Sequence, residues 1–203
     1  MAQLQREEAL LLFGMVRTVR PKTVVEIGFF FGQSAFNFLR AMDHDAMLFS
    51  FDIDGESERF ADIRFGHDPR FRFARKSQDE IVEADIGVGR RIDFLFIDAS
   101  HDLELNQRTF AAIEGLLAPR ALVAIHDTGT WSRSFFTGQF AGQGDTYPGK
   151  WTSEDEYAHQ LDERRFVNWI GETRPQYGQI HFHSDRTRRD GMTLLQAGGP
   201  LAT

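Results

Sequence analysis

The sequence predicts an α/β protein with a mostly parallel seven-stranded sheet, helices on both faces and a C-terminal antiparallel hairpin. The first observation is that short β-branched or aromatic runs alternate with segments of helical period between residues 23 and 125. This alternation is typical of parallel strands joined by right-handed helical crossovers. The second observation is that the runs 178–184 and 192–195 are separated only by a polar turn, which favours an antiparallel hairpin.

The first elements are expected in the order helix, strand, helix. Leu4–Arg20 carries apolar residues at helical spacing, and Pro21 ends this segment. Thr23–Gly28 is a β-branched run of the kind found in buried parallel strands. Phe30–Met42 returns to helical spacing.

The remaining elements continue the alternation. Further strands are expected over Met47–Ile53, Phe71–Arg75, Ile92–Ile97 and Leu122–Ile125. Further helices are expected over Ser77–Ala84, Leu103–Leu117 and Ser153–Ile170. In such a sheet, ligands bind outside the carboxyl ends of the strands. We therefore expect functional side chains where these strands end.

Length and composition limit the classes of protein to which this chain can belong. The 203 residues suit a single domain, which we divide into an N-terminal helix (1–21), a cofactor-binding core (22–127), a lid or substrate loop (128–152) and a C-terminal helix with the hairpin (153–203). The chain has no cysteine, which excludes disulfides, thiolate metal sites and cysteine nucleophiles. The net charge of −7 argues against a nucleic-acid partner. No apolar run is long enough to span a membrane, and the expected location is cytoplasmic.

The most informative stretch follows the first strand. Glu26 lies within the strand, Gly28 and Gly32 follow it, and a helix begins soon after. Glycines at such a turn allow a ligand to approach the backbone closely, and the helix offers free N–H groups to an anion. Phe30 stands where the dinucleotide fingerprint requires its second glycine, so the loop departs from that fingerprint. Asp52 ends the second strand and can accept hydrogen bonds from the hydroxyls of a ribose.

These residues resemble the class I S-adenosylmethionine-dependent methyltransferases. The chain is most similar to metal-dependent O-methyltransferases of the catechol type and to those that modify natural-product sugars. The resemblance implies a Rossmann-like methyltransferase fold and S-adenosylmethionine as cofactor. It also implies that Asp52 holds the ribose. The cofactor-binding residues that it implies are Glu26, Gly28, Phe30, Gly32, Ser34, Asp52, Ser77, Gln78 and Asp98.

The resemblance also implies a catalytic group at the ends of the fourth and fifth strands. Asp98 matches the first metal ligand of the family and is expected to take part in catalysis, and His101 matches its general base. An imidazole can accept a hydroxyl proton near neutral pH. Asp127 matches another metal ligand, while His126 stands where the family commonly has an acidic residue. The resemblance implies a divalent metal, Mg²⁺ or Mn²⁺, on Asp98, His126 and Asp127. Because imidazole suits transition metals better than magnesium, the alternative is that no metal is needed and that Asp127 orients His101 or the substrate hydroxyl.

The expected reaction is methylation of a hydroxyl group on a small molecule. Aromatic residues of the lid or substrate loop would select that acceptor; they are Trp131, Phe135, Phe136, Phe140, Tyr147 and Trp151. A homodimer is favoured as the assembly. The alternatives are a metal-dependent hydrolase, a protein that binds S-adenosylmethionine without turnover, and a nicotinamide-dependent oxidoreductase. The last alternative lacks the glycine fingerprint that it would need.

Overall fold

A computed structural model of the protein describes residues 4–129, 162–182 and 191–198, and every structural statement below concerns those residues. Its centre is a seven-stranded sheet in the order β3-β2-β1-β4-β5-β7-β6. The strands are β1 (Thr23–Ile27), β2 (Met47–Asp52), β3 (Phe71–Arg75), β4 (Ile92–Ile97), β5 (Leu117–His126), β6 (Tyr177–Phe182) and β7 (Met192–Ala197). β1 to β5 are parallel, and β7 is antiparallel to both β5 and β6. The predicted fold class and hairpin are therefore confirmed.

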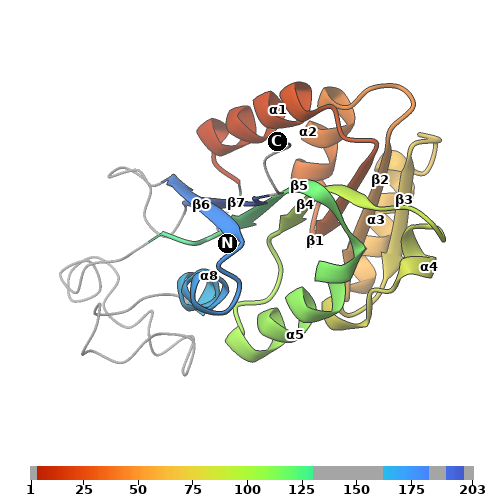
Figure 1. Ribbon diagram of the computed structural model, residues 1–203. Helices are drawn as coiled ribbons and strands as arrows, with labels where there is room; N and C mark the ends of the chain where they lie inside the picture. Colours follow the sequence, from red (N-terminus) through yellow and green to blue (C-terminus); the bar gives the residue numbers. More distant parts are fainter. Residues whose placement is uncertain (1–3, 130–161, 183–190, 199–203) are drawn as a thin grey trace, which may run out of the picture.

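Helices cover both faces of the sheet (Figure 1). Residues of α1 (Arg6–Val19), α2 (Gln33–Ala41) and α3 (Gly55–Phe65) pack into one apolar core. Residues of α4 (Glu83–Ile86), α5 (Leu103–Ile113) and α8 (Asp162–Thr173) pack into a second core on the opposite face. Alternate residues of each central strand join opposite cores, as the period of two in a strand requires. A sheet buried on both faces explains the nearly continuous apolar runs of β1 and β4.

Helix α3 is an element that the sequence analysis did not assign. The side chains that it buries are Ser57, Ala61 and Phe65, four residues apart. This stripe is narrow and contains one large apolar side chain, so its period is hard to see in the sequence. The helix begins at a clear N-cap, because the side chain of Asp54 accepts a hydrogen bond from the backbone N–H of Glu56.

Several predicted helix ends were wrong. α2 begins at Gln33 rather than Phe30, since Phe30 and Gly32 both have positive φ angles and cannot start a right-handed helix. The helix predicted over 77–84 is a 3₁₀ turn (Gln78–Glu80) followed by the single turn of α4. The helix predicted over 103–117 ends as a 3₁₀ turn (Glu114–Leu116) before β5. The helix predicted to end at Ile170 continues to Thr173, and its predicted start at Ser153 lies outside the described residues.

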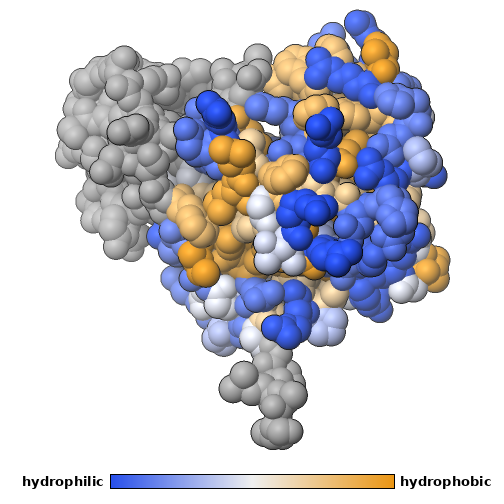
Figure 2. Space-filling model, turned by 90° about the horizontal axis from the view of Figure 1, so that it is seen from above, coloured by the Kyte–Doolittle hydropathy of each residue, from blue (hydrophilic) through white to orange (hydrophobic). Residues whose placement is uncertain are grey.

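The face that carries α1 and α2 has hydrophobic side chains breaking an otherwise hydrophilic surface (Figure 2). Leu10 of α1 and Phe36 of α2 are both more than half exposed. Among the described residues, no helix is long and apolar enough to cross a membrane. The predicted lid or substrate loop and its six aromatic residues lie outside the described residues, apart from Thr128 and Gly129.

Candidate active site

A cavity of 490 Å³ opens at the carboxyl ends of the parallel strands. Strand β1 lies between β2 and β4, so the strand order reverses beside it, and ligands bind at this point in sheets of this kind. The volume lies within the range of small-molecule sites. The cavity wall includes most of the predicted site residues, namely Gly28, Phe30, Ser34, Asp52, Ser77, Gln78, Asp98, His101 and Asp127.

The loop after β1 has a backbone that only glycine allows at two positions. Gly28 has a φ of +94°, and a Cβ atom there would lie 1.9 Å from the carbonyl oxygen of Asp98. Gly32 has a φ of +76°, and its Cβ would lie 2.6 Å from ring atoms of Phe29 and Phe65. The two glycines therefore let the loop lie against the end of β4 and close over the buried ring of Phe29.

Asp52 holds this loop from the end of β2. Its Oδ2 accepts hydrogen bonds from the backbone N–H groups of Phe29 at 3.0 Å and Phe30 at 2.8 Å, and from Ser57 Oγ at 3.0 Å. Its Oδ1 accepts one from Asp54 N at 3.0 Å. Asp52 thus has a structural role that the sequence analysis did not foresee, and it also lines the cavity at the predicted ribose position.

Glu26 is completely buried in the middle of the sheet. Ser50 Oγ donates a hydrogen bond to its Oε2 at 2.5 Å, while Oε1 accepts none within the described residues. Burial raises the pKa of Glu26 to about 8. Hydrogen bonds from Ser34 and Ser50 lower this pKa, and the negative charges of Asp98 and Asp52 raise it. Glu26 was expected to bind the cofactor, but it is not among the residues that line the cavity.

Ser77 and Gln78 begin the 3₁₀ turn after β3. The Nε2 group of Gln78 donates to Asn106 Oδ1 and to Thr109 Oγ1, both at 2.8 Å, and its Oε1 accepts from Ser100 N at 3.2 Å. Gln78 is buried and ties this turn to α5 and to the loop after β4. Gln78 lines the cavity, and its amide is already engaged with protein groups.

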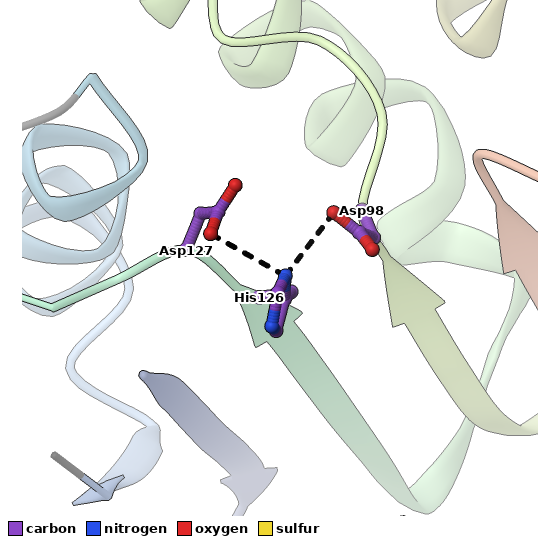
Figure 3. Close-up of side chains that lie close together, drawn as sticks. All are labelled: Asp98, His126 and Asp127. Atoms are coloured by element: carbon purple, nitrogen blue, oxygen red, sulfur yellow. Dashed lines mark hydrogen bonds and ion pairs between the residues drawn. The ribbon is translucent and has the colours of Figure 1, made fainter. Parts of the chain in front are cut away.

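Three of the predicted catalytic and metal-binding side chains converge where β4 and β5 end. Asp98, His126 and Asp127 point toward one another (Figure 3). His126 Nδ1 lies 3.2 Å from Asp98 Oδ1 and 3.5 Å from Asp127 Oδ1. The two strands are neighbours in the sheet, so residues that follow them meet although 28 positions separate Asp98 from His126.

His126 also has a partner on its other nitrogen. Its Nε2 lies 2.9 Å from Oε2 of Glu8, a buried residue of α1. Glu8 Oε1 accepts a hydrogen bond from Gly191 N at 2.9 Å, and Oε2 accepts another from Gln5 N at 3.0 Å. Sequence reasoning missed Glu8, because 118 positions separate it from His126 and it lies in an ordinary amphipathic helix.

The pKa values of His126 and Glu8 are shifted by the charges that surround them. Burial would lower the pKa of His126, but the charge of Asp98, the hydrogen bonds to Asp98 and Glu8 and the charge of Asp127 raise it well above its usual value. Burial would raise the pKa of Glu8, but its interactions with His126 and its backbone hydrogen bonds lower it. These interactions favour the protonated form of His126 and the ionised form of Glu8.

The same donors also fit a divalent metal ion. Asp98, His126 and Asp127 can each offer one ligand atom, and these atoms lie within 4.8 Å of one another. A ligating histidine usually donates its second ring N–H to a carboxylate, and Glu8 is placed to accept that bond from Nε2. A mixed imidazole and carboxylate set suits a transition metal such as Mn²⁺ better than Mg²⁺. Binding would require His126 to lose its Nδ1 proton.

His101 lines the cavity beside Asp127 and is partly exposed. Its Nε2 is 3.9 Å from Asp127 Oδ2, and its Nδ1 contacts Oε1 of Glu163 in α8. Glu163 is a second residue that sequence reasoning missed. It lies 62 positions from His101 in a highly charged segment, where no pattern distinguishes it from its neighbours.

Comparisons with known proteins identify the family of this chain. A family model described as a methyltransferase domain matches residues 25–128, just over half of the chain. A search of the curated proteins found no significant match.

Many solved structures share the fold. An O-methyltransferase of Streptomyces achromogenes, TomG, involved in tomaymycin synthesis and solved in complex with SAM, is 20% identical with a TM-score of 0.71, over 97% of this chain and 82% of that one. An O-methyltransferase of Bacillus cereus in complex with SAH is 15% identical with a TM-score of 0.69, over 97% of this chain and 83% of that one. At these identities the likeness establishes the fold alone.

Proposed function

Since this chain belongs to the methyltransferase domain family, we propose that it transfers a methyl group from S-adenosylmethionine to a hydroxyl group of a small molecule. The observation that carries the proposal is the single cavity that joins the glycine loop after β1 to Asp98, His101 and Asp127. A binding loop on one side and acid–base groups on the other are what this reaction requires. Two neighbours of the same fold, described as O-methyltransferases, were solved with SAM or SAH and support the choice of cofactor.

The cofactor would lie along the ends of β1, β2 and β3. Backbone N–H groups of the loop at Gly28–Gly32, with the hydroxyl of Ser34, would bind its methionine part. Asp52 would hold the ribose, and the turn at Ser77–Gln78 would lie beside the adenine. When bound, S-adenosylmethionine supplies a methyl group already activated on a positively charged sulfur. The protein must then orient this group toward the acceptor and exclude water.

His101 would act as the general base. Its side chain lies at the cavity wall beside Asp127, where an acceptor hydroxyl can be held between them. The imidazole nitrogen would accept the hydroxyl proton as the oxygen attacks the methyl carbon. This role is expected to contribute about 10²- to 10⁴-fold to the rate.

Asp98, His126 and Asp127 would hold a divalent metal with Glu8 behind the imidazole. A metal there would lower the pKa of the acceptor hydroxyl and help to orient it. The protein's own contribution is to aim the three donors at one point and to fix the His126 ring through Glu8. The aromatic residues of the segment 128–152 would then select the acceptor.

The first test is calorimetric titration with S-adenosylhomocysteine, in EDTA and then with Mn²⁺ or Mg²⁺. We expect micromolar binding in both conditions, because the loop and Asp52 do not depend on the metal. Absence of binding in both would refute the methyltransferase proposal and favour a metal-dependent hydrolase. Asp98→Asn should lose Mn²⁺ binding, whereas Asp45→Asn, an exposed control, should keep it.

The second test concerns turnover. The protein is incubated with S-adenosylmethionine and a panel of catechols, sugars and phenolic natural products, and methylated products are identified by mass spectrometry. His101→Gln should bind S-adenosylhomocysteine normally and form product at least about 10²-fold more slowly. If His101→Gln retained the full rate on an identified acceptor, it would not be the base.

A further inference from the structure

A carboxylate from outside the family-matched region is bound to the proposed base. Glu163 lies in the first turn of α8, after the matched residues 25–128. Its Oε1 contacts Nδ1 of His101, and its side chain is only 6% exposed. The other oxygen, Oε2, is buried and accepts no hydrogen bond within the described residues. A carboxylate so enclosed is costly unless it is paired, and among the described residues its partner is His101.

The packing of α8 holds Glu163 in place. Phe166, Val167 and Ile170 are fully buried in the core beneath the sheet. The ring of Phe166 packs edge-on against Phe110 of α5, with 6.0 Å between centroids. Since α5 follows the loop that carries His101, the two helices fix both partners of the contact (Figure 1).

This contact determines which ring nitrogen of His101 carries the proton. A carboxylate can only accept, so Nδ1 must donate its N–H to Glu163. In the neutral ring, Nε2 then bears the lone pair. Nε2 is the nitrogen that lies 3.9 Å from Asp127 Oδ2. The tautomer set by Glu163 is therefore the one that presents a basic nitrogen toward Asp127.

We propose that Glu163 is the positioning residue of His101, holding its ring and its Nδ1–H tautomer so that Nε2 can accept the proton of the methyl acceptor. This inference rests on the proposed function, in which His101 is the base. It adds that the matched core is incomplete as a catalyst, and that the first turn of α8 completes it.

The proton and electron pairs balance with groups already named. The acceptor oxygen forms a bond to the methyl carbon as the carbon–sulfur bond breaks. The electron pair of the broken bond stays on sulfur. The hydroxyl proton moves to Nε2 of His101. The resulting imidazolium is stabilised by the carboxylate of Glu163 through Nδ1–H and later gives its proton to solvent. Glu163 stays ionised throughout.

The spectroscopic test uses the whole chain with ¹⁵N-labelled histidine and needs no acceptor. Signals of His101 are assigned by comparison with His101→Gln. We expect the neutral ring of the wild-type protein to show a protonated Nδ1 and an unprotonated Nε2. Glu163→Gln should shift this signature toward the other tautomer, because its amide can donate as well as accept. Glu172→Gln, an exposed change in the same helix, should leave it unchanged.

The kinetic test uses the acceptor found in the product screen. Glu163→Gln should lower kcat about 10- to 100-fold with little change in S-adenosylhomocysteine affinity. The double variant with His101→Gln should be no slower than His101→Gln alone, because the two residues act as one unit. Glu172→Gln should keep the wild-type rate.

The outcomes separate the two proposals. Failure of the wild-type protein to bind S-adenosylhomocysteine would overturn the methyltransferase proposal and, with it, the positioning role. Normal binding together with a neutral His101 ring that carries its proton on Nε2 instead of Nδ1 would overturn the role of Glu163 alone, even if its variants failed to fold. Normal binding with equal and additive rate losses in the double variant would likewise overturn it.

Discussion

Replacing Glu26 by glutamine should remove a pH-dependent loss of stability. This carboxyl lies in the middle of the sheet with no exposed surface. Burial raises its pKa to about 8, although the hydroxyls of Ser34 and Ser50 lower it. Its pKa in the unfolded chain is near 4.5. The unfolded chain therefore ionises at a pH where the folded protein still keeps the proton.

The sign and size of the pH effect on stability follow from the difference between the folded and unfolded pKa of Glu26. A group whose pKa is raised by folding contributes stability that is present below the unfolded pKa and is lost as pH rises toward the folded pKa. Over the window from 4.5 to about 8, the loss is roughly 1.4 kcal/mol per pH unit. Between about pH 5.5 and about pH 7.5 it amounts to roughly 3 kcal/mol. Glutamine has no such titration and keeps an oxygen that can accept from Ser50.

The assay is urea unfolding of the wild-type protein and Glu26→Gln at these two pH values. The wild-type protein should lose about 3 kcal/mol more unfolding free energy than the variant between the lower and the higher pH. Glu58→Gln, a change on the exposed face of α3, should follow the wild-type dependence. Parallel curves for wild type and Glu26→Gln would refute the argument, because they would mean that Glu26 ionises alike in both states.

Three further predictions concern the residues that shape the site. Gly28→Ala should lose S-adenosylhomocysteine binding in calorimetry and about 2–5 kcal/mol of stability, since its φ is +94° and its Cβ would meet the Asp98 carbonyl oxygen. Glu8→Ala should cost about 3–5 kcal/mol in urea unfolding by leaving buried His126 without its Nε2 partner. Gln78→Ala should cost about 2–4 kcal/mol in the same assay, because three hydrogen bonds to protein groups are lost.

Two of these predictions have a matched control variant. Gly89→Ala has a similar φ of +83° but open space around its Cβ, so it should be strained without affecting binding. Equal binding loss in Gly28→Ala and Gly89→Ala would contradict the steric argument. Glu7→Ala, next to Glu8 on the exposed side of α1, should be nearly neutral. A cost below about 1 kcal/mol for Glu8→Ala or Gln78→Ala would mean that solvent replaces the lost partners.

The sheet could be predicted because its signals are local. β4 is a nearly continuous apolar run in the middle of the sheet, and β3 mixes apolar and charged residues at its edge, so both strands were predicted with the bounds that the structure has. The helices and their ends were harder to predict than the strands. The amphipathic signal of α3 is weak, and the start of α2 depends on a loop whose positive φ angles no periodicity reveals.

In the candidate site, too, some residues could be predicted from the sequence and others could not. The glycine loop, Asp52 and the strand ends that bear Asp98, His101 and Asp127 could be predicted, because each belongs to a short motif at the end of a strand. The contacts of Glu8 with His126 and of Glu163 with His101 could not, because they depend on how the chain packs. Both carboxylates come from flanking helices, and a charged residue on a helix looks the same in sequence whether it faces water or a buried imidazole. Its role depends on where the helix packs, and that is set by apolar contacts distributed over the whole fold.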